Sequence, residues 1–233
     1  MSTFAGRING FNRQLSFKGE LPGHIRIMNP FREKGPAGAV SSAFYEKFYN
    51  DNEKRHLILG INPGRHGAGV TGVPFTDTKR LREVCGIAYE GQETLELSSV
   101  FMYDMIAAYG GVADFYSKFY INSVCPLGFT RIGARGKQVN CNYYDTAALQ
   151  QAVYDFIVTT LRKQLRLGVY TETCFCLGTG KNEHFLRKLN EQYGFFKRIV
   201  ALEHPRFIDQ YKAGYRQEYI NKYIWTLRSG LHS

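Results

Sequence analysis

The most informative stretch of this sequence is Leu57-Ile58-Leu59-Gly60-Ile61-Asn62-Pro63-Gly64. A short apolar run that stops at glycine, asparagine and proline is typical of a buried strand that ends in a turn. We expect this strand to deliver the amide side chain of Asn62 into a glycine-rich crevice. The segment Thr71-Gly72-Val73-Pro74-Phe75 follows a few residues later and adds an aromatic side chain. Together the two segments predict a functional site at one end of the strand.

Four short apolar runs along the chain predict strands, and helical patterns lie between them. The runs are His56 to Ile61, Phe119 to Val124, Thr173 to Leu177, and Arg198 to Leu202. The clearest helical pattern extends from Thr146 to Leu167, where Asp145 is placed to cap the start and Gly168 to end the helix. Another extends from about Gly214 to Leu227. Strands that alternate with helices favour a mainly parallel sheet covered on both faces.

The composition predicts one domain over residues 1–233. With 44% hydrophobic and 15% aromatic residues, the chain can bury a sizeable core, and it contains no internal repeat or low-complexity stretch. Residues 1–40 are rich in glycine, proline and arginine. We expect them to form an irregular N-terminal segment packed over the surface of the domain.

The charge of the chain favours a polyanionic partner. Its net charge is +10 and its isoelectric point is about 9.4, and phosphate groups bind lysine and arginine strongly. Basic proteins without a nucleic-acid role are also common.

The five cysteines are an odd number without a Cys-x-x-Cys pair, which argues against a disulfide framework. With no signal-like start and no apolar run of about eighteen residues, we expect a soluble protein of the cytoplasm, or of the nucleus in a eukaryote. Separately, we expect the protein to be a monomer.

Four polar features lie at the ends of the predicted strands or directly after them. Ligands bind at the carboxyl ends of the strands in parallel sheets, so these positions are compared first. They are Asn62, Asn122, the turn Gly178-Thr179-Gly180-Lys181, and His204. Each has an ordinary explanation on its own, since an asparagine after a strand is usually a turn former. The four together predict a site at one rim of the sheet.

The residue types at this rim exclude several kinds of chemistry. They contain no carboxylate pair and no Ser-His-Asp arrangement. Cys174 and Cys176 with His184 come nearest to a metal-binding pattern, and we interpret these cysteines as core residues. The glycines of residues 67–72 match a dinucleotide-binding pattern that does not open a helix, and the turn at 178–181 lacks the spacing of a phosphate-binding loop. We therefore predict no metal and no cofactor.

An amide and an imidazole suit hydrolysis with an anionic leaving group, because they orient water and stabilise the departing charge. On these residues the sequence resembles the uracil-DNA glycosylase superfamily, and most closely its single-strand-selective monofunctional (SMUG) branch. The resemblance spans about residues 28–211. It rests on an ordered set of motifs: Met28-Asn29-Pro30-Phe31, Gly60-Ile61-Asn62-Pro63-Gly64, Thr71-Gly72-Val73-Pro74-Phe75, Asn122 with Cys125-Pro126-Leu127, and His204-Pro205.

The resemblance implies a three-layer α/β sandwich around a central four-stranded, mainly parallel sheet flanked by helices. It also implies an enzyme of base excision repair that flips uracil out of DNA and hydrolyses its N-glycosidic bond without a cofactor. Asn62 would position the attacking water, and His204 would hydrogen-bond the O2 atom of the leaving base. Phe75 would stack on the flipped base, and Asn122 would read its N3 and O4 atoms. The base pocket would be completed by Gly60, Ile61 and Pro63.

Gly64 carries a prediction about substrate range. In uracil-specific relatives, a tyrosine directly after the motif proline excludes substituents at C5 of the base. Gly64 leaves that space open, so the resemblance implies tolerance of 5-hydroxymethyluracil. The alternative is a glycine kept only for the geometry of the turn.

Basic residues near the motifs are the expected contacts to DNA phosphates. They are Arg65, His66, Lys181 and Arg206. Base flipping also needs a side chain that fills the gap in the duplex, and the candidates are Arg206, Phe207 and Ile208. Here the chain departs from the SMUG branch, whose members continue the His-Pro motif with Ser-Pro-Arg-Asn-Pro. Because no lysine lies in the motifs, we expect no Schiff base and no strand cleavage.

Two alternatives stay open. A mismatch-specific uracil or thymine glycosylase shares the motif at residues 60–64, although His204-Pro205 argues against it because that branch carries Asn-Ser there. A catalytically silent DNA-binding module of the same fold is the alternative from another class. The preferred base (uracil, 5-hydroxymethyluracil or a deaminated purine) and the preference for single or double strands are left open as well.

Overall fold

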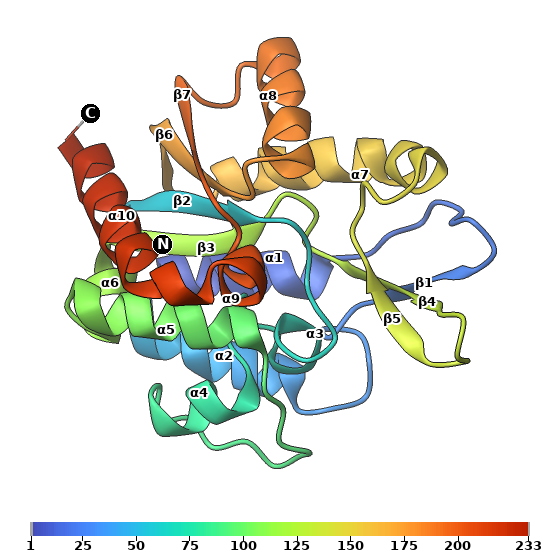
Figure 1. Cartoon of the computed structure of the whole chain (residues 1–233), viewed down its shortest axis with the longest axis horizontal. Helices are drawn as coiled ribbons and strands as arrows, with labels where there is room; N and C mark the ends of the chain where they lie inside the picture. The colour runs from blue at the N-terminus through green and yellow to red at the C-terminus, as the bar shows by residue number, and fades with distance from the viewer. Residues whose placement is uncertain (1, 233) are drawn as a thin grey trace.

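A parallel four-stranded sheet forms the centre of the computed structural model, which describes residues 2–232 (Figure 1). Its strands are ordered β3-β2-β6-β7, and each neighbouring pair is parallel. They span Arg55–Gly60 (β2), Phe119–Ser123 (β3), Val169–Leu177 (β6) and Arg198–Leu202 (β7). The four strands predicted from the apolar runs and the parallel sheet are confirmed.

Strand β2 lies inside this sheet and is buried along its whole length. Its residues Leu57, Ile58 and Leu59 are at most 1% exposed. Strands β3 and β6 pair with its two edges, and helices cover the sheet, so the strand shows a continuous apolar run rather than an alternating one. The residues after Gly60 therefore emerge among the ends of neighbouring strands.

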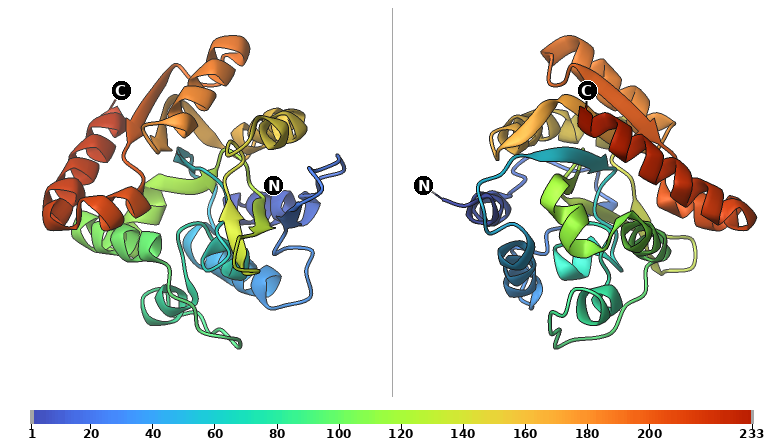
Figure 2. Two further views of the ribbon diagram at one scale, coloured as in Figure 1. Left: turned by 45° about the vertical axis from the view of Figure 1, so that its right-hand side comes forward. Right: turned by 90° about the vertical axis from the view of Figure 1, so that its left-hand side faces the viewer.

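Helices cover both faces of the sheet (Figures 1 and 2). Helices α7 (Ala147–Leu165) and α8 (Lys181–Tyr193) lie on one face, and α5 (Leu97–Tyr109) and α10 (Arg216–Ser229) lie on the other. This arrangement confirms the predicted three-layer sandwich. Helix α7 begins where the sequence predicts it. Its cap, however, is the hydroxyl of Thr146, which accepts the backbone N–H of Leu149, and not Asp145.

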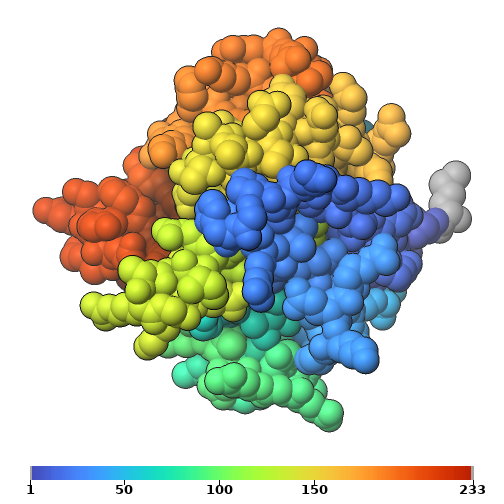
Figure 3. Space-filling model, turned by 90° about the vertical axis from the view of Figure 1, so that its right-hand side faces the viewer, coloured from blue at the N-terminus to red at the C-terminus, as the bar shows by residue number. Residues whose placement is uncertain are grey.

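The N-terminal segment is more regular than predicted. It contains helix α1 (Phe4–Gln14) and strand β1 (Ile25–Met28), so the expectation of an irregular segment over residues 1–40 is wrong for these parts. Burial of apolar side chains offsets the poor helix propensity of the glycines and asparagines in α1. The buried apolar residues of this helix are Phe4, Ala5, Ile8 and Phe11. Figure 3 shows the segment spread over the surface between α7 and the chain that follows β3.

A second sheet, which was not predicted from the sequence, contains β1, β4 and β5. Strand β4 (Gly128–Ile132) pairs antiparallel with β1 and with β5 (Gln138–Cys141). Gly136 lies in the turn between β4 and β5 with a φ of 68°, a conformation that favours glycine. This sheet matters for the site because the end of β5 lies beside the end of β2, where Asn62 Nδ2 donates to the carbonyl of Cys141.

The remaining helices are short or lie at the periphery. They are α2 (Ala37–Phe48), α3 (Ala68–Thr71), α4 (Thr78–Glu83), α6 (Val112–Lys118), α9 (Pro205–Tyr211) and two 3₁₀ turns at Ala213–Tyr215 and Gly230–His232. All five cysteines are buried and carry free thiols. Within residues 2–232, no helix combines the length and the apolar character needed to cross a membrane.

Arg55, at the start of β2, is a buried charge that is bonded to three partners. The residue is only 1% exposed. Its guanidinium donates to the carbonyls of Tyr116 and Glu53, each at 2.8 Å, and pairs with Asp51 at 2.6 Å. These contacts tie the start of the central strand to α6 and to the loop before β2.

We predict that Arg55→Ala lowers the free energy of unfolding by about 3 kcal/mol or more, because it opens a cavity and leaves two carbonyl groups without donors. Chemical denaturation followed by circular dichroism measures the change. The control Lys54→Ala removes an exposed neighbouring charge and should cost less than about 1 kcal/mol. A similarly small loss for Arg55→Ala would contradict the role given to its contacts.

Candidate active site

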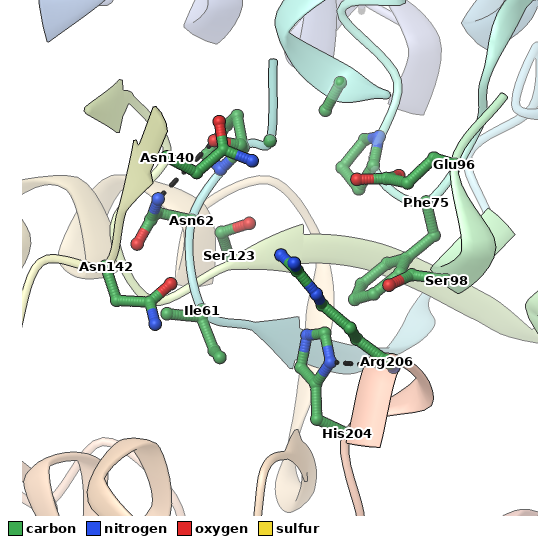
Figure 4. Close-up of a pocket in the computed structure, with 14 residues that line it drawn as sticks. Ile61, Asn62, Phe75, Glu96, Ser98, Ser123, Asn140, Asn142, His204 and Arg206 are labelled. Carbon is green, nitrogen blue, oxygen red and sulfur yellow. Dashed lines mark hydrogen bonds between the residues drawn. The ribbon is translucent and has the colours of Figure 1, made fainter. Parts of the chain in front are cut away.

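A cavity opens at the carboxyl end of β2, among the connections that follow β2, β3, β5 and β7 (Figure 4). Its volume is about 130 Å³. Pockets for drug-sized ligands have volumes of roughly 300 Å³ or more, so this smaller cavity suits one small planar ring. The structure brings Asn62, Phe75 and His204 together in it, as the sequence predicts. The full lining is Ile61, Asn62, Pro63, Gly64, Ala68, Pro74, Phe75, Glu96, Ser98, Ser123, Asn140, Asn142, His204 and Arg206.

The side chain of Asn62 is held in one orientation. Its Oδ1 atom accepts the backbone N–H of Tyr143 at 3.0 Å, and its Nδ2 atom donates to the carbonyl of Cys141 at 3.1 Å. Both partners belong to the end of β5 or to the turn that follows it. An amide oxygen accepts two hydrogen bonds, so Oδ1 keeps one lone pair for a further donor. Asn62 is therefore a fixed acceptor that can orient a water molecule.

Phe75 stands across the cavity from Asn62, on a strained backbone (Figure 4). Its φ of 52° is left-handed, a conformation that costs a bulky residue about 1 to 3 kcal/mol. The loop is held by buried Thr71, whose hydroxyl donates to the carbonyl of Thr76 at 2.7 Å. Gly60 makes room for the ring, because a Cβ atom there would lie 2.9 Å from Phe75 Cε2. The loop thus presents the ring as a flat surface at the cavity.

His204 follows β7 and caps helix α9. The backbone N–H of Arg206 donates to His204 Nδ1 at 3.2 Å. A ring nitrogen that accepts a hydrogen bond carries no proton, so the neutral imidazole has its proton on Nε2. Burial, together with the positive charge of Arg206, lowers the pKa of His204 to about 4. At neutral pH the ring is therefore uncharged and offers an N–H donor.

Ser123, and not Asn122, lines the cavity. The two residues are consecutive in β3, so their side chains point to opposite faces of the sheet. The amide of Asn122 is used internally, because Nδ2 donates to Tyr120 Oη at 2.7 Å and Oδ1 accepts the N–H of Ser123 at 2.8 Å. Asn122 instead lines a small cavity of about 10 Å³ that adjoins the first one and shares Pro63, Ala68 and Pro74 with it, so its predicted contact with the base stays a prediction.

The space beside Gly64 is not open, in contrast to the expectation from the sequence. A Cβ atom at Gly64 would lie 2.7 Å from Glu96 Oε1 and 3.5 Å from Asn140 Nδ2. The carboxylate of Glu96 thus occupies the volume that was expected to be empty. Burial raises the pKa of Glu96 to about 7. The wall next to Gly64 is consequently polar and titratable near neutral pH.

Three of the four predicted phosphate contacts lie together. Arg65, His66 and Arg206 line a groove of about 420 Å³ that shares residues with the cavity and opens beside it. Lys181 does not line this groove. It is exposed at the start of α8, where its Nζ atom lies 6.0 Å from the ring centre of Tyr144.

The segment after His204 forms helix α9, and it narrows the choice of a side chain that could fill a gap in a duplex. Ile208 is completely buried, so its candidacy is wrong. Phe207 is 42% exposed, and its ring lies 5.5 Å from the ring of Tyr211. Arg206 lines the cavity. Phe207 is therefore the apolar candidate that this helix presents to solvent.

Five polar residues of the cavity wall were not predicted. Asn140 and Asn142 stand two apart around the end of β5, so they share one face, and this alternation is a signal that the sequence carries. Glu96 and Ser98 reach the cavity only through the path of the long segment after Phe75, for which no local pattern exists. The five residues are Glu96, Ser98, Ser123, Asn140 and Asn142.

The residues that came nearest to a metal-binding pattern in the sequence do not lie together in the structure. Cys174 and Cys176 are buried in β6, whereas His184 is exposed on α8. In the part of the chain that the structure describes, no group of three or more His, Cys, Asp or Glu side chains is arranged to hold a metal ion. The described residues that line the cavity include no lysine.

We predict that His204 titrates near pH 4, well below its ordinary value of about 6.5. NMR of the ring nitrogens over a pH series measures the pKa and the tautomer, and the form with the proton on Nε2 should persist through neutral pH. Arg206→Ala should raise the pKa only in part, because it removes the nearby charge and leaves the burial. Titration of the wild-type ring near pH 6.5 would contradict this assignment.

Comparisons with known proteins identify the family. The model of the uracil DNA glycosylase superfamily matches residues 46–228. Among solved structures, the crystal structure of wild-type SMUG2 from Pedobacter heparinus matches with a TM-score of 0.97 and 59% sequence identity, over 100% of both chains. Nothing among the curated proteins matches the sequence. The chain therefore belongs to the uracil-DNA glycosylase superfamily, a family of hydrolases that act on DNA.

Proposed function

We propose that this protein is a monofunctional DNA glycosylase that hydrolyses the N-glycosidic bond of uracil, and of 5-hydroxymethyluracil, in DNA. The observation that supports this most is the single cavity that holds Asn62, Phe75 and His204. The matched relative is named SMUG2. The target base has to leave the stack before it can enter the cavity, because its glycosidic bond is out of reach inside the duplex.

Asn62 acts on the attacking water. Its free Oδ1 lone pair accepts a hydrogen bond from the water, and the water oxygen is then directed at C1′ of the sugar. The backbone groups of Tyr143 and Cys141 hold the amide in place. The geometry is therefore set before the reaction starts, and little entropy is lost at the transition state.

His204 acts on the leaving base. As the glycosidic bond breaks, its electron pair stays with the base, and negative charge develops on O2. The neutral Nε2–H group of His204 donates a hydrogen bond to this oxygen and stabilises the anion. Because the pKa of His204 is lowered to about 4, the ring supplies this donor without carrying a charge of its own.

Phe75 and Ser123 recognise the base. The aromatic ring stacks on the base, an interaction worth about 1 to 3 kcal/mol. The hydroxyl of Ser123 both donates and accepts, so it can meet either N3–H or O4 of uracil. One hydroxyl makes fewer simultaneous bonds than an amide, so discrimination at this edge is looser than Asn122 would provide.

DNA binds along the groove beside the cavity. Arg65, His66 and Arg206 line this groove and contact phosphates on either side of the flipped nucleotide, consistent with the net charge of +10. Lys181 makes a more distant phosphate contact. Phe207 fills the gap that the base leaves in a duplex. The protein acts as a monomer inside the cell.

The test of the proposed function is excision from synthetic DNA that contains one uracil. Purified protein should create alkali-sensitive abasic sites, and borohydride should trap no covalent adduct. His204→Asn keeps an acceptor for the N–H of Arg206 and lacks the imidazole, so it should slow the single-turnover rate about 10²- to 10³-fold. The same change at exposed His184 is the control. Binding without excision would support the silent DNA-binding module, and intact uracil would refute the proposal.

A second prediction separates the two neighbours on β3. Ser123→Ala should lower the rate of uracil excision about tenfold with little change in thermal stability, because only the base loses a hydrogen bond. Asn122→Ala should lower the free energy of unfolding by about 1 to 3 kcal/mol, while the folded enzyme keeps its rate within about threefold. Single-turnover kinetics and thermal unfolding on the same samples measure both. The opposite pattern would restore Asn122 as the base reader.

A further inference from the structure

Glu96 is a carboxylate on the cavity wall that the proposed reaction does not use. Its backbone N–H donates to Asp77 Oδ2 at 2.9 Å, and Ser99 Oγ donates to Glu96 Oε2 at 3.2 Å. The hydroxyl of Ser99 in turn accepts the N–H of Asp77 at 3.1 Å. Asp77 is fully buried. This network holds the carboxylate of Glu96 at a defined place on the wall.

The carboxylate lies against the turn that follows Asn62. A Cβ atom at Gly64 would lie 2.7 Å from Glu96 Oε1, and a Cβ atom at Gly67 would overlap Oε2. A side chain at either glycine would therefore displace the carboxylate. The two glycines allow Glu96 to form this part of the wall.

Glu96 and His204 stand on opposite sides of the cavity, and Phe75 lies between them on one flank (Figure 4). In a pyrimidine ring, C5 is directly across from C2. A uracil that rests on Phe75 with O2 at His204 therefore points C5 toward Glu96. The resemblance to the family independently implies the same orientation of the base. It places C5 of the base beside Gly64, and Glu96 lies against Gly64.

We propose that Glu96 determines which 5-substituted uracils the enzyme accepts, favouring a hydroxymethyl group and rejecting the methyl group of thymine. This inference rests on the proposed function. The hydroxyl of 5-hydroxymethyluracil donates a charge-assisted hydrogen bond to Glu96. With uracil, the small C5–H group leaves room for water at the carboxylate. The methyl group of thymine displaces that water and leaves Glu96 Oε1 without a donor, because the hydroxyl of Ser99 serves only Oε2.

An enzyme discriminates more strongly against a substrate that leaves a buried polar group without a hydrogen bond than against one that differs only in size. A hydrophobic pocket distinguishes one methylene group by about 10- to 200-fold, whereas a site built to bond a hydroxyl rejects an analogue without it by about 10⁴- to 10⁵-fold. Thymine is abundant in DNA, and Gly64 provides no bulky side chain against it. Glu96 therefore discriminates against a methyl group at C5 of the base and still accepts a polar substituent there.

The charge of Glu96 depends on groups from several elements. Burial raises the pKa of Glu96 to about 7, and the negative charge of Asp77 raises it as well. The hydrogen bond from Ser99 and the positive charge of Arg206 lower the pKa and so oppose this rise. Figure 4 shows the side chain of Arg206 reaching from α9 into the cavity. Across the adjoining groove lie the charged group of Arg65 and the imidazole of His66, whose pKa is lowered by burial and by the charge of Arg65. Because an ionised carboxylate is the stronger acceptor, the preference for 5-hydroxymethyluracil should rise as pH rises through about 7.

The experiment measures single-turnover excision of uracil, 5-hydroxymethyluracil and thymine from otherwise identical strands. Each rate is divided by the uracil rate of the same variant, which cancels changes in folding, DNA binding and catalysis that all bases share. Glu96→Leu should lower the 5-hydroxymethyluracil ratio and raise the thymine ratio, each by about tenfold or more. Glu96→Gln keeps the shape and an acceptor for Ser99, so its ratios should be intermediate. The matched control is Glu93→Leu, because Glu93 is 56% exposed and pairs with Arg82 outside the cavity.

Several outcomes would overturn the inference while uracil excision proceeds normally. They are ratios for Glu96→Leu within about threefold of the wild-type ratios, a wild-type enzyme that leaves 5-hydroxymethyluracil intact, and a ratio that does not change with pH. If Glu96→Leu does not fold, the test uses Glu96→Gln and the pH series of the wild-type enzyme. Ratios for Glu96→Gln that equal the wild-type ratios, or wild-type ratios that do not change with pH, would overturn the inference. Failure of the proposed function is distinguishable, because it shows as an absence of uracil excision by the wild-type protein, and it ends both proposals.

Discussion

The central strand β2 ends in the interior of the protein, and each polar group at that end has to find a partner. The carbonyl of Gly60 accepts the N–H of Val124 at 2.9 Å, and the carbonyl of Ile61 accepts the N–H of Cys125 at 3.1 Å. These bonds continue the pairing with β3 past the last residue of the sheet. The amide of Asn62 completes the set. Its two hydrogen bonds, from the N–H of Tyr143 and to the carbonyl of Cys141, connect the end of the central strand to the end of β5 and thereby fix the position of Asn62.

The same hydrogen bonds join the two sheets at the site. Tyr143 donates its N–H to Asn62 and its hydroxyl to Asn182 Oδ1, at 2.8 Å. Asn182 Nδ2 donates to the carbonyl of Leu177 at the end of β6, at 3.1 Å. The ends of β2, β5 and β6 and the start of α8 are thus linked by three side chains. The small second sheet is therefore part of the site, because it supplies the partners of Asn62 as well as cavity residues such as Asn140.

Much of the fold was predictable because its signals are local. The continuous apolar run of a strand buried on both faces identifies β2, β3, β6 and β7, and the spacing of apolar residues identifies α7. The second sheet was not predictable in this way. Strand β1 is only partly buried, and it is defined by pairing with distant β4, for example Ile25 with Arg131. Helix α1 likewise depends on burial of Phe4 and its neighbours, and its own propensity is poor.

The sequence by itself determined that an asparagine, a phenylalanine and a histidine follow strands and turns, and these residues, Asn62, Phe75 and His204, share one cavity. Only the tertiary structure decided that Ser123 and not Asn122 faces the cavity, and that Glu96 fills the space beside Gly64. The physical reason is the same in both cases. Which face of a strand meets a cavity depends on its register with its neighbours, and a contact between distant segments depends on the path of the whole chain.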